Sequence, residues 1–128
     1  MHTTNGAALV VDDQADVRQV LGAMLARLGY TPVLAGGGVE AVAALRADRA
    51  DVAGALLDVQ MPGMDGPATL AALHALDPNL PCVFLSGNTG RYSAADLLGC
   101  GAVAVLDKPV PLDLLNDTLA AAVAPGPA

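Results

Sequence analysis

The chain has 128 residues, a length that suits one domain, and its 13 acidic and 6 basic side chains give a formal net charge of −7. This acidity argues against direct binding to nucleic acid, because phosphate backbones attract basic surfaces. Hydrophobic residues make up 54% of the chain, yet its longest stretch without Asp, Glu, Lys or Arg, residues 78–90, is too short for a transmembrane helix of about 20 residues.

Apolar runs that favour β-strands alternate along the chain with segments whose apolar residues recur at helical spacing. In chain order, strands are predicted at residues 8–11, 31–35, 53–57, 82–85 and 102–106. A helix that ends at Gly29 follows the first strand, and further helices are predicted near residues 39–47, 67–76, 92–98 and 111–123. The glycines at 36–38 and the Pro62-Gly63 pair mark two of the intervening turns.

Five strand-then-helix units predict an α/β fold, in which a doubly wound, mainly parallel sheet is covered by helices on both faces. Parallel strands that are buried on both faces are continuously apolar, which accounts for the high hydrophobic content without a membrane. No linker or repeat divides the chain. We therefore expect one domain over residues 7–123, with flexible tails at residues 1–6 and 124–128.

The two cysteines and the N-terminal residues predict a cellular compartment. Cys82 and Cys100 fit neither a disulfide framework nor a four-ligand zinc site, although both precede neighbouring strands and a disulfide is geometrically conceivable. Residues 1–6 contain no basic stretch followed by an apolar core, so a secretory signal is not expected. We therefore expect a cytoplasmic protein with reduced cysteines.

Polar side chains stand where four of the predicted strands end. Asp12 and Asp13 follow the first strand, Asp58 the third and Ser86 the fourth, and Lys108, the only lysine of the chain, follows the fifth. Taken singly, Asp12 and Asp13 could cap a helix, Asp58 could be a turn residue and Lys108 could be a solvated surface charge. Ser86 alone is a still weaker signal of function. Because ligands of open α/β sheets bind outside the carboxyl ends of the strands, their common position predicts a functional site.

The types of these residues predict the chemistry of the site. Three carboxylates close together repel one another, and without compensation at least one would take up a proton. A hard divalent cation removes that cost, and Mg²⁺ commonly takes one or two carboxylates, several waters and a phosphate oxygen. We therefore expect a Mg²⁺ cofactor and phosphoryl transfer, in which a carboxylate attacks phosphorus while Lys108 and Ser86 hold the phosphoryl oxygens.

Four motifs, in order over nearly the whole chain, resemble those of the receiver domains of two-component response regulators. They are Val10-Val11-Asp12-Asp13, residues 57–66 (LDVQMPGMDG), Leu85-Ser86-Gly87 and Lys108-Pro109. The resemblance implies a flavodoxin-like fold with five parallel strands in the order 2-1-3-4-5 and five flanking helices.

The resemblance also implies a role for each site residue. Asp58 is the implied phosphoacceptor. By the same resemblance, Mg²⁺ would be bound by Asp58, by Asp13 directly, by Asp12 mainly through a bound water and by the backbone carbonyl of Gln60. The remaining implied roles are phosphoryl binding by Ser86, Lys108 and the backbone N–H groups of Gln60 and Gly87, and a cis peptide bond before Pro109.

One position departs from the family pattern. Receiver domains usually carry Tyr or Phe three residues before the motif lysine, and that ring moves inward when the hydroxyl on the fourth strand shifts. This chain has Val105 there. Because valine cannot make the movement of a large ring, we expect a muted or differently propagated conformational change.

The expected function is a phosphoacceptor switch that takes a phosphoryl group from a phosphohistidine on a sensor kinase or a phosphotransfer protein and signals to a downstream protein target. Only self-phosphorylation and self-dephosphorylation are expected as catalysis. The chain is expected to be a stand-alone regulator that acts through protein contacts, an intermediate of a phosphate relay, or a receiver excised from a larger protein. The alternatives are a haloacid-dehalogenase-like phosphohydrolase, which would need a second Asp where Gln60 stands, and a phosphorylation-independent interaction module.

Overall fold

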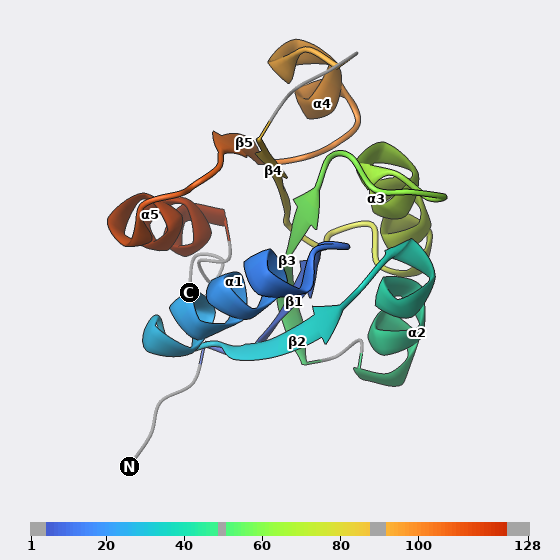
Figure 1. The fold of residues 1–128 in the computed structure, drawn as a ribbon. Helices are drawn as coiled ribbons and strands as arrows, with labels where there is room; N and C mark the ends of the chain where they lie inside the picture. Colours follow the sequence, from blue (N-terminus) through green and yellow to red (C-terminus); the bar gives the residue numbers. More distant parts are fainter. Residues whose placement is uncertain (1–4, 49–50, 88–91, 123–128) are drawn as a thin grey trace.

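The computed structural model describes residues 5–48, 51–87 and 92–122, where five strands alternate with five helices (Figure 1). The strands are β1 (Ala7–Val11), β2 (Thr31–Ala35), β3 (Val52–Asp58), β4 (Cys82–Ser86) and β5 (Ala104–Asp107). The helices are α1 (Ala15–Arg27), α2 (Gly38–Asp48), α3 (Gly66–Leu76), α4 (Ala94–Gly99) and α5 (Leu112–Ala122). Each predicted element is present at its place in the chain.

The sheet is parallel throughout, with the strand order β2-β1-β3-β4-β5. This order confirms the doubly wound fold. The carboxyl ends of all strands therefore meet at one edge. The order in which the chain adds strands to the sheet reverses between β1 and β3, and open α/β sheets bind their ligands at such a point. The register places Asp58 beside Leu85 and Ser86 beside Asp107 at that edge.

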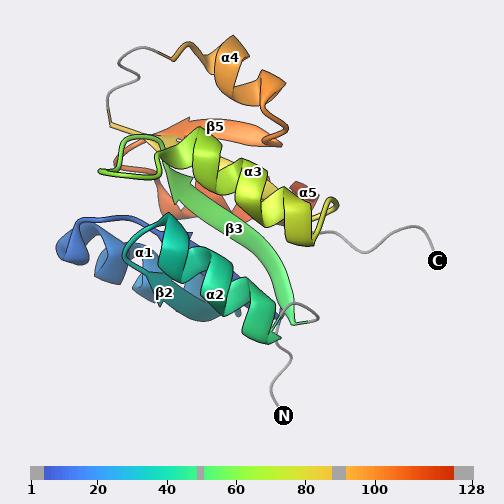
Figure 2. The same ribbon diagram turned by 90° about the vertical axis from the view of Figure 1, so that its right-hand side faces the viewer.

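Helices cover both faces of the sheet, α1 and α5 on one and α2 and α3 on the other (Figures 1 and 2). Alternate strand residues point into the two cores because side chains along a strand alternate between faces. Leu9, Leu57 and Phe84 pack with residues of α2 and α3, whereas Val10 and Leu56 pack with residues of α1 and α5. Both faces of the central strands are thus buried, as their apolar sequences predict.

Two elements begin two residues later than predicted. In β5, Val103 is exposed, so the first strand residue is Ala104. In α4, a capping box delays the start to Ala94: the Ser93 hydroxyl accepts the Asp96 N–H and the Asp96 carboxylate accepts the Ser93 N–H, both at 3.0 Å. The apolar pattern alone does not show where such a cap lies.

Part of the predicted N-terminal tail contacts the domain. The Asn5 backbone N–H donates to the Gly29 carbonyl and its side-chain amide donates to the Leu28 carbonyl, each at 2.8 Å. Residues 1–4 and 124–128 of the predicted tails lie outside the described residues. In the part of the chain that is described, no helix has the length and apolar character needed to cross a membrane.

The two cysteines are free thiols in contrasting surroundings. Cys82 is fully buried at the start of β4, whereas Cys100 is exposed just after α4. Burial, with a smaller contribution from the Asp77 charge, raises the pKa of the Cys82 thiol to about 12. The reduced state expected from the sequence is therefore what the structure has, and Cys82 packs as a small hydrophobic residue.

We expect iodoacetamide at pH 8 to label the native protein once, at Cys100, because only an accessible thiolate reacts. Peptide mapping by mass spectrometry would locate the label, and Cys82 should react only after denaturation. The Cys100→Ser variant is the matched control and should remain unlabelled in the native state. Rapid labelling of Cys82 in that variant would contradict the burial of its thiol.

Candidate functional site

The turn between β1 and α1 carries two of the candidate ligands. Asp12 is 1% exposed, whereas Asp13 is exposed to solvent. The Asp12 carboxylate accepts the Gln14 N–H at 2.9 Å, and the Arg18 guanidinium donates to the Asp12 backbone carbonyl at 2.7 Å. These bonds hold the turn in place, with one carboxylate inside the site and the other at its mouth.

Asp58 is the last residue of the central strand β3 and is 8% exposed. Helix α3 begins directly against it, because the Gly66 N–H donates to the Val59 carbonyl at 2.8 Å. A Cβ at position 66 would lie 2.6 Å from the Asp58 carbonyl oxygen, closer than real Cβ contacts allow. Glycine at position 66 therefore permits the close approach of α3 to the backbone of Asp58.

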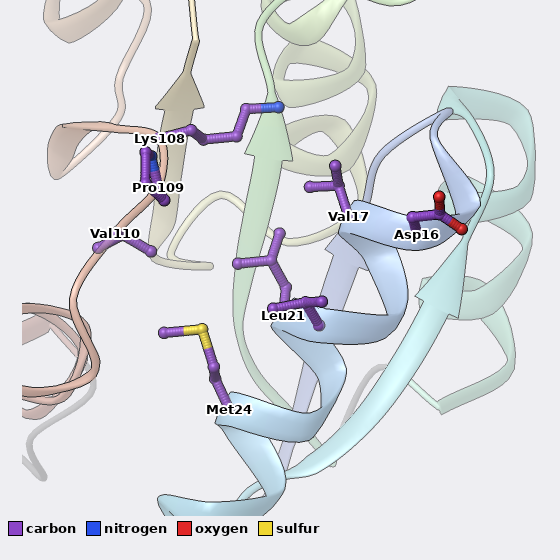
Figure 3. Close-up of a pocket in the computed structure, with 8 residues that line it drawn as sticks. Asp16, Val17, Leu21, Met24, Lys108, Pro109 and Val110 are labelled. Atoms are coloured by element: carbon purple, nitrogen blue, oxygen red, sulfur yellow. The ribbon is translucent and has the colours of Figure 1, made fainter.

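Lys108 connects the acidic residues of the two strands. Its Nζ donates to Asp12 Oδ2 at 3.2 Å and to Asp58 Oδ1 at 3.1 Å. Figure 3 shows the side chain reaching from the segment after β5 toward the end of β3. The following Lys108–Pro109 peptide bond is cis. A single ammonium group thus bridges two buried carboxylates.

The electrostatics of the site follow from this crowding. Carboxylate oxygens of Asp12, Asp13 and Asp58 all lie within 4.8 Å of one another. Burial raises the pKa of Asp58, Lys108 opposes this through its hydrogen bond and its charge, and the charges of Asp12 and Asp13 raise it further. For Lys108, burial acts to lower the pKa, but the hydrogen bonds and charges of Asp58 and Asp12 outweigh it, and the pKa is raised.

The three carboxylates fit a hard divalent cation. They offer one oxygen each from a compact set, which is the donor chemistry that Mg²⁺ requires. Burial is the main cause of the raised pKa of Asp58, and the charges of Asp12 and Asp13 add to it; this added repulsion is the cost that a cation would remove. Asp12, Asp13 and Asp58 are therefore the side chains that would hold Mg²⁺.

Two of the remaining predicted residues line the same opening, and Ser86 directly precedes one of them. Gln60 and Gly87 line a pocket of about 260 Å³ together with Asp13, Asp58 and Lys108. Ser86 lies at the end of β4, 3% exposed, and its hydroxyl has no hydrogen-bond partner within the described ranges. A buried hydroxyl without a partner is costly, so Ser86 has an unused donor at the end of β4, next to Gly87 in the chain.

Val105 lies in β5 behind the site. It is half-buried and packs against the core formed with α2 and α3. The muted conformational change expected from this valine stays a prediction.

Three further residues that shape the site were missed by sequence reasoning. Arg18 holds the Asp12 carbonyl, and its position one turn after the acidic pair in a helix is the only signal for it. Gly66 ends the motif at residues 57–66, which could have indicated a close approach. The Tyr92 hydroxyl donates to Asp65 Oδ2 at 2.7 Å, across 27 residues, and no local pattern indicates this contact.

A family model described as the response regulator receiver domain matches residues 8–120. The chain belongs to this family. Receiver domains are signalling modules of two-component systems, in which they interact with histidine kinases and phosphotransfer proteins, and they bind Mg²⁺ at an acidic pocket. The cluster of Asp12, Asp13 and Asp58 lies where such a pocket is expected.

Curated relatives of this receiver domain include regulators and a kinase. The transcriptional regulatory protein ZraR of Salmonella typhimurium is 38% identical over 116 residues, 91% of this chain and 26% of that protein. The sensor histidine kinase RcsC of the same organism is 38% identical over 88% of this chain and 12% of its own length. The chain therefore spans about a quarter or less of these proteins.

Solved structures agree with the fold. The chemotaxis protein CheY4 of Vibrio cholerae has a TM-score of 0.82 at 28% identity and covers 91% of this chain and 98% of its own. A receiver domain protein of Clostridium thermocellum has a TM-score of 0.86 at 22% identity, covering 92% and 94% respectively. The five-stranded fold is thus shared along nearly the entire chain.

Proposed function

We propose that this receiver domain is a phosphorylation switch in which Asp58 accepts a phosphoryl group from a phosphohistidine with the help of Mg²⁺. The observation that carries this proposal is the pair of ion pairs by which Lys108 bridges Asp12 and Asp58 at the carboxyl edge of the sheet. This bridge supports the proposal because it keeps an ammonium group next to the Asp58 carboxylate, which is the proposed nucleophile, and next to Asp12, one of the proposed metal ligands.

The transfer exchanges one bond to phosphorus for another. A carboxylate oxygen of Asp58 forms a bond to phosphorus while the phosphorus–nitrogen bond breaks, and the imidazole nitrogen keeps the electron pair and takes up a proton. The product is an acyl phosphate on Asp58. Attack of water on phosphorus then breaks that bond, which restores the Asp58 carboxylate and releases inorganic phosphate.

The chain's own donors are arranged for the charge that develops. The Lys108 ammonium group carries three N–H donors, so it can turn one toward a phosphoryl oxygen. The Ser86 hydroxyl has no partner within the described ranges and can donate to a second oxygen. The backbone N–H groups of Gln60 and Gly87 lie at the same pocket and would serve the remaining oxygens. Mg²⁺, when bound, neutralises charge on the phosphoryl oxygens.

The proposed donor is a sensor histidine kinase or a histidine phosphotransfer protein, and the output is a contact with a downstream protein in the cytoplasm. A phosphohydrolase of the haloacid-dehalogenase type is less well supported, because the exposed Gln60 stands where that chemistry needs an acid/base and an amide cannot transfer protons.

The proposal is tested by incubating the protein with acetyl phosphate and Mg²⁺ and measuring intact mass. Wild type should gain one phosphoryl group, and Asp58→Ala should gain none. Asp117→Ala, which removes an exposed carboxylate from α5, is the matched control and should be modified like wild type. Modification of Asp58→Ala to the wild-type extent would overturn the assignment. No modification of wild type would instead favour a phosphorylation-independent module.

Mg²⁺ is expected to stabilise the folded domain because it relieves repulsion among the three carboxylates. At 100 times its Kd, a ligand that binds only the native state adds about 2.7 kcal/mol. For a domain of this size this corresponds to an increase in Tm of roughly 10 °C, measurable by calorimetry against sodium chloride of equal ionic strength. Asp13→Asn alters an exposed ligand only, and an unchanged Mg²⁺ effect in this variant would contradict the metal site.

A further inference from the structure

A hydrogen bond joins two segments that each begin at a strand of the phosphoacceptor site. The Tyr92 hydroxyl, in the connection after β4, donates to Asp65 Oδ2, in the connection after β3, at 2.7 Å. The acceptor is a carboxylate, and hydrogen bonds to charged groups are stronger than neutral ones. This Tyr92–Asp65 bond therefore ties the segment that follows Asp58 to the segment that follows Ser86.

The Asp65 end of the bond is fixed to Asp58. Asp65 caps α3, since its Oδ1 accepts the Ala68 N–H at 3.0 Å. The next residue, Gly66, donates its N–H to the Val59 carbonyl at 2.8 Å and approaches the Asp58 carbonyl too closely for any Cβ. A shift in the backbone of Asp58 therefore moves Asp65 with it.

The Tyr92 end is fixed to α4. Tyr92 is half-buried against the core and directly precedes Ser93, which forms the capping box of α4 with Asp96. Leu97 is the only fully buried residue of this six-residue helix. Because α4 is short and largely exposed, Tyr92 and Leu97 supply much of its attachment to the domain.

The bond also borders a pocket that adjoins the site. Val59, Gln60, Met61, Pro62, Asp65 and Tyr92 line this second pocket of about 430 Å³. Gln60 also lines the pocket that contains Asp58 and Lys108. The Tyr92–Asp65 bond thus forms part of the wall of a space that shares a residue with the phosphoacceptor pocket.

We propose that the Tyr92–Asp65 hydrogen bond transmits the phosphorylation state of Asp58 to α4. This inference rests on the proposed function and assigns it a route through side chains of this chain. Tyr92 is a positioning residue: it acts through Asp65, the backbone of Gly66 and the carbonyl of Val59. Phosphorylation of Asp58 shifts the first turn of α3, and the Tyr92–Asp65 bond passes this shift to α4. The surface at α4 changes as a result.

The test compares amide spectra of ¹⁵N-labelled protein with and without beryllofluoride and Mg²⁺, a phosphoryl mimic. Tyr92→Phe removes only the hydroxyl. Asp65→Ser keeps an oxygen that can cap α3 but lacks the second oxygen that accepts from Tyr92. Tyr30→Phe is the matched control, because Tyr30 precedes β2 at the opposite edge of the sheet.

In wild type and in Tyr30→Phe, we expect the amides of residues 94–99 to shift together with those of Gln60 and Lys108. In Tyr92→Phe and Asp65→Ser, Gln60 and Lys108 should shift as in wild type, while the shifts of residues 94–99 fall to less than half. Full shifts of α4 in Tyr92→Phe, or no shift of α4 in wild type that binds the mimic, would overturn the inference alone. Absence of any response at Gln60 and Lys108 in wild type would overturn the proposed function as well.

Discussion

Replacing Lys108 with methionine is expected to reduce the rate at which Asp58 is phosphorylated by acetyl phosphate by a factor of roughly 100 to 1,000. Loss of one preorganised donor to developing charge costs about 2.7–4 kcal/mol in the transition state. Methionine is unbranched like lysine and can follow the same path, so the change removes the ammonium group while leaving the packing largely intact.

Among the described residues, Lys108 is the cation that contacts the carboxylates of the site. It is the only lysine of the chain, and its Nζ contacts both Asp12 and Asp58. Arg18 is directed elsewhere, because its guanidinium donates to the Asp12 backbone carbonyl. Without Lys108 the pKa of Asp58 should rise further, since the hydrogen bond and charge that oppose its burial are lost. A larger fraction of Asp58 would then be protonated and non-nucleophilic at a given pH.

The measurement is the initial rate of phosphorylation at saturating Mg²⁺, followed by intact mass, with circular dichroism to confirm folding. Lys108→Arg keeps the charge but places a planar group in the site, so it should recover only part of the rate. A rate for Lys108→Met within threefold of wild type would show that the lysine does not take part in transfer.

The positions of the strands were predictable because buried parallel strands leave a continuous apolar signal. Each run stops where a polar residue must reach the edge of the sheet, so the same signal also located Asp12, Asp58 and Ser86. This is why the fold and the positions of the main candidate site residues follow from one sequence. Strand order needed more than the apolar signal: it came from the resemblance carried by the four motifs.

Contacts between distant segments were not predictable. Asp12 is buried and Asp13 is exposed, and this difference depends on the conformation of the turn after β1. The hydrogen bond from Arg18 to the Asp12 carbonyl depends on the arginine side chain reaching back toward the start of α1. The Tyr92–Asp65 bond depends on how two connections lie in space. A sequence pattern reports local periodicity and burial, and it contains no record of these distances.

Replacing Gly66 with alanine is expected to destabilise the domain by about 3 kcal/mol, at the upper end of the range for overpacking a core. The new methyl group would lie 2.6 Å from the Asp58 carbonyl oxygen and 2.9 Å from both the Val59 Cα and the Phe84 ring. Two of these three neighbours are backbone atoms, which cannot turn aside like a side chain. To relieve this steric overlap, α3 must move away from the end of β3, and that movement weakens the hydrogen bond between the Gly66 N–H and the Val59 carbonyl.

Such a loss should lower Tm by roughly 10 °C for a domain of this size, measured by calorimetry. Gly99→Ala is the matched control: a Cβ there meets no atom within 4 Å, and alanine at a helical position should be neutral or stabilise by up to about 1 kcal/mol. Equal Tm values for Gly66→Ala and Gly99→Ala would show that α3 can shift without cost. The expected difference in Tm would instead show that the first turn of α3 is held against Asp58, so that Asp58 and this helix move as one unit.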